Sequence, residues 1–119
     1  MGEYKLGAIE RKFAELIWRH EPLSSGQLVK LCQQELNWKK STTYTVLRRL
    51  CQRGIFQNRD SVVTSLLTEQ EFDARQSQQF VEEAFDGSLP KFLAAFTRQK
   101  KLTEREIEEL EQLIRKNGR

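Results

Sequence analysis

The side chains best suited to chemistry lie in a basic segment from Trp38 to Arg59 that contains no acidic residue. When residues 40–53 are drawn as a helix, the apolar side chains and Thr43 collect on one side. The opposite side and its flanks then present hydroxyl, phenol and guanidinium groups: Ser41, Thr42, Tyr44, Thr45, Arg48 and Arg49. Further cations precede this helix, end it or follow it: Lys39, Lys40, Arg53 and Arg59.

These residue types are suited to binding double-stranded DNA. Short hydroxyls can approach base edges in the major groove, and an arginine can donate two hydrogen bonds to guanine. Lys39 and Lys40 lie at the N-terminus of the expected helix, where free N–H groups and the helix dipole already favour a phosphate. We therefore predict four groove readers: Ser41, Thr42, Thr45 and Arg48. The other basic residues are expected to contact phosphates or to flank the groove.

The charge distribution also indicates a polyanionic partner. Residues 1–67 hold 11 Lys and Arg against 6 Asp and Glu, a net charge of +5. Residues 68–119 hold 9 against 11, a net charge of −2. Because the excess of positive charge is confined to the first half, that half is the expected DNA-binding part.

Catalysis and metal binding find no support in the sequence. The paired carboxylates Glu82–Glu83 and Glu108–Glu109 have no histidine or nucleophile beside them. The single histidine, His20, and the isolated Cys32 and Cys51 cannot assemble a closed zinc site within one chain. We expect no enzyme activity, no metal and no cofactor.

The chain is also expected to be cytoplasmic, without insertion into a membrane. Its apolar runs are far shorter than the roughly 18 residues that would cross a bilayer. The first residues lack the apolar core of a signal peptide.

Three short helices and a hairpin must position the basic segment. Apolar spacing predicts a helix over residues 7–20, and Ser24 with Gln27 forms a capping box for a second helix over residues 25–36. The third helix covers residues 40–53 and ends before Gly54. Residues 55–59 and 62–67 then read as a small hairpin. This order predicts a winged helix-turn-helix domain over residues 1–67.

Residues 68–119 are predicted to form a helical dimerisation region. Its helices run from Thr68 to about Asp86, through a short helix that begins near Pro90, and onward from Thr103, which forms a capping box with Glu106. It carries more apolar surface than so small a tail can bury on itself: Phe80, Val81, Phe85, Leu89, Phe92, Leu93, Phe96, Leu110 and Ile114. A homodimer formed through these residues would cover that surface.

Several segments together resemble the BlaI/MecI (penicillinase repressor) family of bacterial transcriptional regulators. They are Ile9 to Trp18, Pro22-Leu23-Ser24, Trp38, Ser41 to Leu50, Arg53-Gly54, Leu67 to Glu71 and Leu102 to Leu110. The resemblance implies a mainly α (α+β) fold, with an N-terminal winged helix and a helical dimerisation tail. It also implies a homodimeric repressor that binds palindromic operator DNA. In this family a membrane sensor-peptidase triggers cleavage of the tail, and the corresponding bond here is Ala95–Phe96.

Two other functions remain open at this stage. A charged helix face is most often simply solvated. Residues 61–65 of the wing carry no basic or aromatic side chain, so the winged helix could instead be a protein-interaction module that has lost DNA binding and binds acidic partners through the same basic surface. A small-molecule-sensing regulator is the second alternative, and it would need a ligand pocket beside the helical tail.

Overall fold

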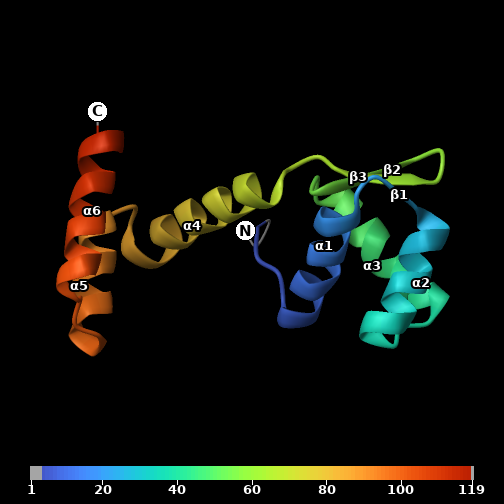
Figure 1. The fold of residues 1–119 in the computed structure, drawn as a ribbon, viewed down its shortest axis with the longest axis horizontal. Coiled ribbons are helices and arrows are strands. Elements are labelled where there is room, and N and C mark those ends of the chain that lie inside the picture. The colour runs from blue at the N-terminus through green and yellow to red at the C-terminus, as the bar shows by residue number, and fades with distance from the viewer. Residues whose placement is uncertain (1–3, 119) are drawn as a thin grey trace. The chain divides into compact units, whose positions relative to one another are not determined.

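The computed structural model describes residues 4–118 and divides the chain into two compact units, residues 1–79 and 80–119 (Figure 1). Its helices and strands, in chain order, are α1 (Ala8–His20), β1 (Leu23–Ser24), α2 (Ser25–Leu36), α3 (Lys40–Gln52), β2 (Phe56–Arg59), β3 (Val62–Ser65), α4 (Glu69–Phe85), α5 (Leu89–Gln99) and α6 (Glu104–Asn117). The helices and the hairpin lie where the sequence predicts them, within about two residues. None of the described helices is long and apolar enough to cross a membrane.

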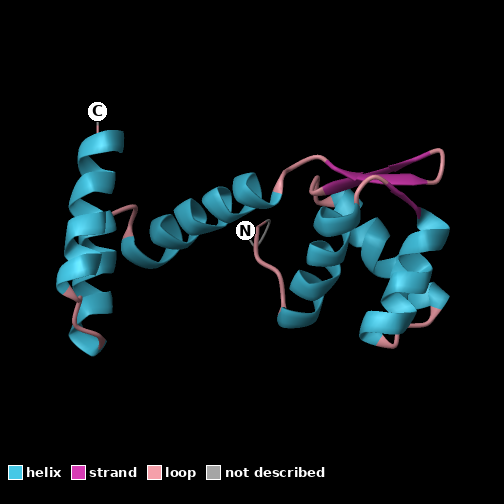
Figure 2. Ribbon diagram, in the orientation of Figure 1, coloured by secondary structure: helices cyan, strands magenta, loops and turns pink. Residues whose placement is uncertain are grey.

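The first unit is a winged helix, which confirms the predicted fold. Helices α1, α2 and α3 stand beside a three-stranded antiparallel sheet in the order β1-β3-β2 (Figure 2). The hairpin of β2 and β3 pairs Phe56 with Ser65 and Arg59 with Val62. Strand β1 was not predicted, because two residues are too few to show the alternation typical of a strand. It pairs Leu23 with Val63 and so ties the hairpin to the start of α2.

Local signals set the boundaries of the second and third helices. The Ser24 hydroxyl accepts the Gln27 N–H at 3.0 Å, and the Gln27 side chain accepts the Ser24 N–H at 2.8 Å. This reciprocal pair is the predicted capping box. After α3, Gly54 has φ +78°, a conformation that side chains disfavour, and the chain turns there into β2.

The core of the first unit includes Phe72, which comes from α4. Phe72 is completely buried, and its ring lies 5.6 Å from the Trp18 ring. Trp18 also lies 5.4 Å from the Phe56 ring and donates its indole N–H to the Leu67 carbonyl at 3.0 Å. Trp18 therefore joins α1, the wing and α4. Because Phe72 completes this core, the compact unit extends to residue 79. The division of function at residue 67 remains a prediction.

An arginine cluster fastens the beginning of α4 to α1. The Arg11 guanidinium lies 2.8 Å from Asp73, 2.8 Å from Glu69 and 3.2 Å from Glu15. The hydrogen bond to Asp73 is the main reason why the pKa of Arg11 is raised. The same guanidinium stacks 5.4 Å from the centre of the Trp18 ring. The first half of α4 is thus held by charge as well as by the burial of Phe72.

The second unit consists of the end of α4 together with α5 and α6. The predicted Thr103–Glu106 capping box begins α6, with distances of 2.9 and 3.1 Å. Pro90 lies in the first turn of α5, as predicted, where its missing N–H costs no hydrogen bond. No side chain within residues 80–118 is buried. The large apolar side chains of these residues are therefore all at least partly accessible.

Candidate nucleic-acid interface

Helix α3 presents a polar outer side, as the helical periodicity of the sequence predicts. Its inward residues, Thr43, Val46, Leu47 and Leu50, are buried. The predicted groove readers and the two lysines before them are all exposed: Lys39, Lys40, Ser41, Thr42, Thr45 and Arg48. The exposed set contains hydroxyl groups and cations without an acid. It therefore has the chemistry that base edges and phosphates require.

The N-terminus of α3 is open to an anion. Lys39 occupies the N-cap position, and no side chain caps the free N–H groups there. Both Lys39 and Lys40 are exposed at this end. The free N–H groups and two ammonium groups support the same ligand, a phosphate.

A backbone hydrogen bond restricts the Thr45 hydroxyl. The Thr45 hydroxyl donates to the Ser41 carbonyl at 2.9 Å, one turn earlier in α3. Its proton is therefore engaged, while its lone pairs and its methyl group remain available to a ligand. Such a side chain can accept a hydrogen bond from a base or contact a thymine methyl.

A small hollow of about 220 Å³ separates α3 from the wing. It is lined by Tyr44, Leu47, Arg48, Cys51 and Asn58. Tyr44 is half-buried, and its hydroxyl lies 3.2 Å from the Ser25 hydroxyl at the start of α2. Tyr44 therefore joins two helices in addition to lining the hollow. No signal in the sequence selects Asn58, because only the fold brings this strand residue to the hollow that Arg48 also lines.

Two of the predicted DNA contacts also have partners within the protein. The Arg49 guanidinium lies 3.0 Å from the Glu10 carboxylate in α1. Arg53 donates to the Lys5 carbonyl at 2.8 Å. Partial burial alone would raise the pKa of Glu10, but the hydrogen bond from the Gly7 N–H and the Arg49 guanidinium outweigh that effect and lower it. Glu10 is consequently an anion at neutral pH and holds one edge of Arg49.

The wing supplies one cation with an acid beside it. Arg59 is exposed at the end of β2, and exposed Asp60 follows it in the turn. Asp60 and Ser61 both have positive φ, 52° and 64°, as a tight hairpin turn demands. The Asp60 carboxylate weakens the attraction of this tip for a phosphate, so α3 carries more of the basic character than the wing.

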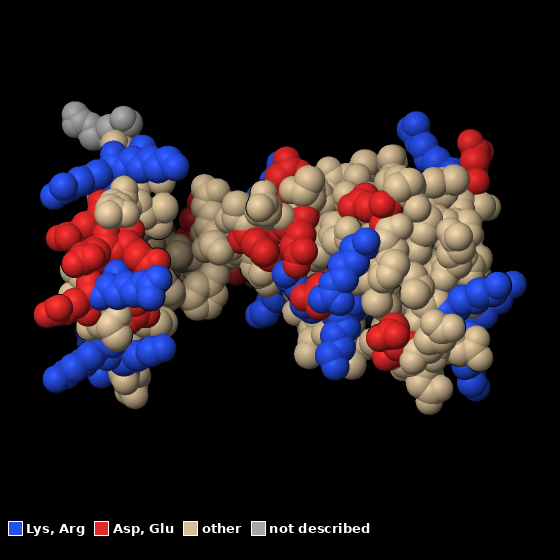
Figure 3. All heavy atoms as spheres, in the orientation of Figure 1, with Lys and Arg blue, Asp and Glu red and all other residues tan. Residues whose placement is uncertain are grey.

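Charge is distributed differently over the second unit. On the face shown in Figure 3, acidic and basic side chains lie intermixed over α5 and α6. The outer side of α3, by contrast, carries no acid. This face of the second unit therefore lacks the acid-free surface that a polyanion requires.

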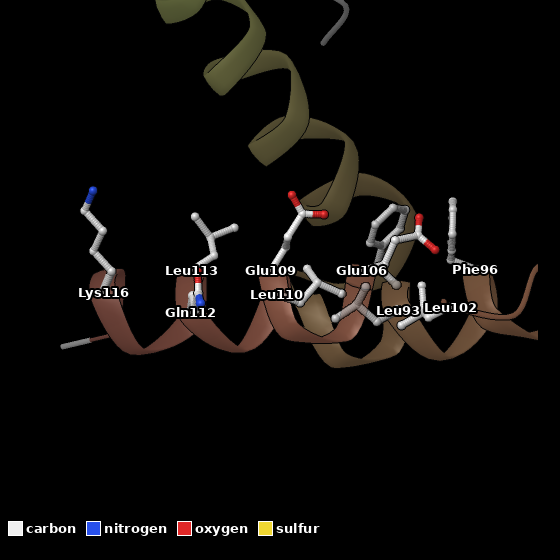
Figure 4. Close-up of a pocket in the computed structure, with 10 residues that line it drawn as sticks. Leu93, Phe96, Leu102, Glu106, Glu109, Leu110, Gln112, Leu113 and Lys116 are labelled. Carbon is white, nitrogen blue, oxygen red and sulfur yellow. The ribbon is translucent and has the colours of Figure 1, made fainter. Parts of the chain in front are cut away.

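An apolar groove of about 680 Å³ runs along α5 and α6 (Figure 4). Its apolar lining comes from both helices and the loop between them: Phe92, Leu93, Phe96, Leu102, Leu110 and Leu113. Glu106, Glu109, Gln112 and Lys116 supply its polar lining. The groove has the composition of a protein-binding surface, with apolar walls and charged groups beside them.

The structure brings only part of the predicted dimerisation set into this groove. Four members line it, namely Phe92, Leu93, Phe96 and Leu110. Four residues of the predicted set are exposed, namely Phe80, Leu89, Phe96 and Ile114, whereas Val81 and Phe85 are half-buried. The Phe80, Phe85 and Phe92 rings form a cluster with centroids 5.5 to 6.1 Å apart.

Two apolar residues of the groove, Leu102 and Leu113, were not predicted, although the sequence contains signals for both. Leu113 lies three residues after Leu110 and so shares its side of α6. Leu102 directly precedes the Thr103 cap, a position where an apolar residue commonly packs on the first turn of a helix.

The bond that corresponds to the family's cleavage site lies inside a helix. Ala95 and Phe96 are in α5, where Ala95 is half-buried and Phe96 is exposed. The Thr97 hydroxyl donates to the Leu93 carbonyl at 2.8 Å and so braces the same turn. A peptidase that binds extended substrates would have to unwind this turn first.

Neither cysteine has the environment of a reactive thiol. Burial raises the pKa of both Cys32 and Cys51, so both stay protonated at neutral pH. Within the described residues, no group of three or more His, Cys, Asp and Glu side chains is arranged to hold a metal ion.

The chain was compared with known proteins. The family model for the penicillinase repressor matches residues 6–116. The methicillin resistance regulatory protein MecI of Staphylococcus aureus (strain Mu50 / ATCC 700699) is 25% identical over 117 residues, which cover 95% of both chains. The same protein of Mammaliicoccus sciuri is 24% identical over 117 residues. The penicillinase repressor of Bacillus licheniformis is 25% identical over 109 residues, which cover 88% of this chain and 85% of the relative.

These matches agree with the resemblance noted in the sequence and with the winged helix described above. The match spans almost the whole chain and so includes both units. The chain therefore belongs to the penicillinase repressor family of transcriptional repressors.

Proposed function

We propose that this protein is a homodimeric transcriptional repressor that binds double-stranded operator DNA through α3. The observation that carries the proposal is the outer side of α3, which is exposed, rich in hydroxyl groups and cations, and free of acids. It belongs to a winged helix in a chain of a repressor family. In helix-turn-helix proteins the corresponding helix enters the major groove.

Within this proposal the residues of α3, its two caps and the wing divide into two roles. Ser41, Thr42, Thr45 and Arg48 read base edges. The remaining cations position the protein on the DNA backbone: Lys39, Lys40, Arg49, Arg53 and Arg59. Tyr44 flanks the groove and holds α3 against α2, since its hydroxyl contacts Ser25.

Dimerisation is proposed to occur through the second unit. The groove along α5 and α6 is lined by six apolar side chains, and residues 80–118 contain no buried one. A second copy would cover this surface. Because a two-fold dimer presents two equivalent α3 helices, its operator should be an inverted repeat.

Cleavage by a sensor-peptidase would release repression by weakening this dimer. Breaking the Ala95–Phe96 bond would separate Phe92 and Leu93 from Leu102, Leu110 and Leu113, which line the same groove. A protomer that no longer dimerises loses the effective concentration that its partner provides at the second half-site.

Selection of DNA from a random pool tests the proposed function. The purified full-length protein should enrich an inverted repeat whose half-sites are separated by about one helical turn. A variant carrying Arg48→Ala and Lys40→Ala provides the matched control and should enrich little. If the wild-type protein enriches no sequence, the protein-interaction module becomes the better account. Selection that occurs only with an added small molecule would favour the ligand-sensing regulator.

A further inference from the structure

Arg49 differs from the other predicted DNA contacts because an acid from another helix holds it. Arg49 lies in the last turn of α3, in the same row as Thr42 and Thr45. Its Nη1 atom donates to Glu10 Oε2 at 3.0 Å, although the two residues are 39 positions apart in the sequence. Helix α1 therefore reaches the edge of the surface that α3 presents.

The Glu10 carboxylate is itself fixed. Its second oxygen, Oε1, accepts the Gly7 N–H at 3.2 Å. The Glu10 side chain is only 22% exposed, whereas Arg49 is 52% exposed. The pair thus places a largely covered anion behind a largely open cation, so the guanidinium is presented outward.

We propose that Glu10 is a positioning residue that holds Arg49 in the orientation needed to bind a DNA phosphate. This inference rests on the proposed DNA-binding function and assigns a role within it to a residue of α1. A guanidinium has five N–H donors, and a single bond to Glu10 leaves the others for a phosphate oxygen. A long side chain that is already held loses less conformational freedom when it binds.

Glu10 also has an opposing effect on DNA binding. Its negative charge repels the DNA backbone and partly offsets the positive charge of Arg49. Salt screens this repulsion. A variant that lacks another acid of the first unit measures how much the loss of one negative charge changes DNA affinity. Exposed Glu35 in α2 is a suitable reference residue, because Glu35→Ala removes one negative charge from a helix other than α1 and α3. The difference in DNA affinity between Glu10→Ala and Glu35→Ala then measures the positioning effect.

A double-mutant cycle on the full-length chain separates the two effects. Dissociation constants would be measured over a series of salt concentrations for the wild type, Glu10→Ala, Arg49→Ala, the double variant and Glu35→Ala. Relative to Glu35→Ala, we expect Glu10→Ala to bind a non-specific duplex about three- to tenfold more weakly. Its salt slope should fall by up to about one. In the Arg49→Ala background the same change should weaken binding no further.

A conservative variant distinguishes positioning from a general effect on folding. Glu10→Gln keeps one of the two acceptor oxygens, and that oxygen can accept from Arg49 in place of Gly7, so the variant should recover part of the lost affinity. The far-ultraviolet circular dichroism of each variant shows whether it is folded. If Glu10→Ala is unfolded, the dissociation constants of Glu10→Gln with and without Arg49→Ala still provide the comparison.

Three results would overturn this inference. Binding by Glu10→Ala as tight as, or tighter than, binding by Glu35→Ala would show that Glu10 only competes with DNA for Arg49. If Glu10→Ala reduced DNA affinity equally in the wild type and in the Arg49→Ala background, the role of Glu10 would be structural and independent of this arginine. If the wild-type protein bound no duplex at all, the proposed function would fail first, and the role of the pair with it.

Discussion

Phe72 is predicted to be essential for the stability of the winged helix, although it lies beyond the wing in the sequence. Its side chain is 0% exposed and contacts Trp18 of α1 and Tyr4 of the N-terminal segment, with ring centroids 5.6 and 6.1 Å away. The substitution Phe72→Ala leaves a cavity that these rings can fill only in part. Replacement of a buried phenylalanine by alanine costs about 3 to 5 kcal/mol. That is a large fraction of a typical domain's stability of about 5 to 15 kcal/mol.

Tryptophan fluorescence during urea unfolding of the full-length protein measures this loss. The chain has 2 tryptophans, Trp18 and Trp38, and both lie in the first unit. With a urea dependence of about 1 to 3 kcal/mol per molar, a loss of about 3 to 5 kcal/mol should lower the midpoint by about 1 to 5 M. All variants would be compared at one protein concentration, because the proposed dimerisation would contribute to apparent stability.

Phe80→Ala is the matched control, since it removes the same side chain from the same helix. Phe80 is 53% exposed and contacts the Phe85 and Phe92 rings of the second unit. It should leave the tryptophan transition almost unchanged. A loss below about 1 kcal/mol for Phe72→Ala would refute the claim that α4 completes the first core.

The remaining predictions concern DNA binding, pH and assembly. Arg48→Ala should weaken specific binding by about 1 to 3 kcal/mol and relax the preference at one base pair. Lys40→Ala should weaken binding to all duplexes and lower the salt slope by about one. Gel-shift titrations would measure both effects. The pKa of Glu10 is lower in the folded state than in the unfolded state, so ionised Glu10 stabilises the fold above its unfolded pKa. This stabilisation is lost as the pH falls through the folded pKa. Glu10→Gln should remove this part of the acid dependence, as thermal melts at several pH values would show. Leu113→Asp places a charge in the apolar groove and should convert a dimer into monomers in light scattering, and a dimer that persists would locate the interface elsewhere.

Local sequence signals were sufficient to predict the helices and the wing. Ser24 with Gln27 and Thr103 with Glu106 form capping boxes that act over three residues, so their effect on helix ends can be read directly from the sequence. The outer side of α3 follows from the helical repeat alone, which is why its exposed residues were predicted correctly. The two-residue strand β1 has no such repeat and was missed.

Contacts between distant residues could not be predicted in the same way. Glu10 and Arg49 each look like ordinary surface charges in the sequence, and only the packing of α1 against the other helices brings them together. The link from Arg11 to Asp73 spans 62 residues and likewise depends on the fold. For the same reason the sequence did not show that Phe72 belongs to the core of the first compact unit, which extends to residue 79. The functional division at residue 67 stays a prediction.

The affinity of the full-length protein for two duplexes at one salt concentration tests the central claim most directly. One duplex would carry the inverted repeat enriched from the random pool, and the other the same bases in scrambled order. If α3 reads base edges, the protein should bind the inverted repeat at least about a thousandfold more tightly than the scrambled duplex. Equal affinities for the two duplexes would contradict sequence-specific DNA binding by this protein.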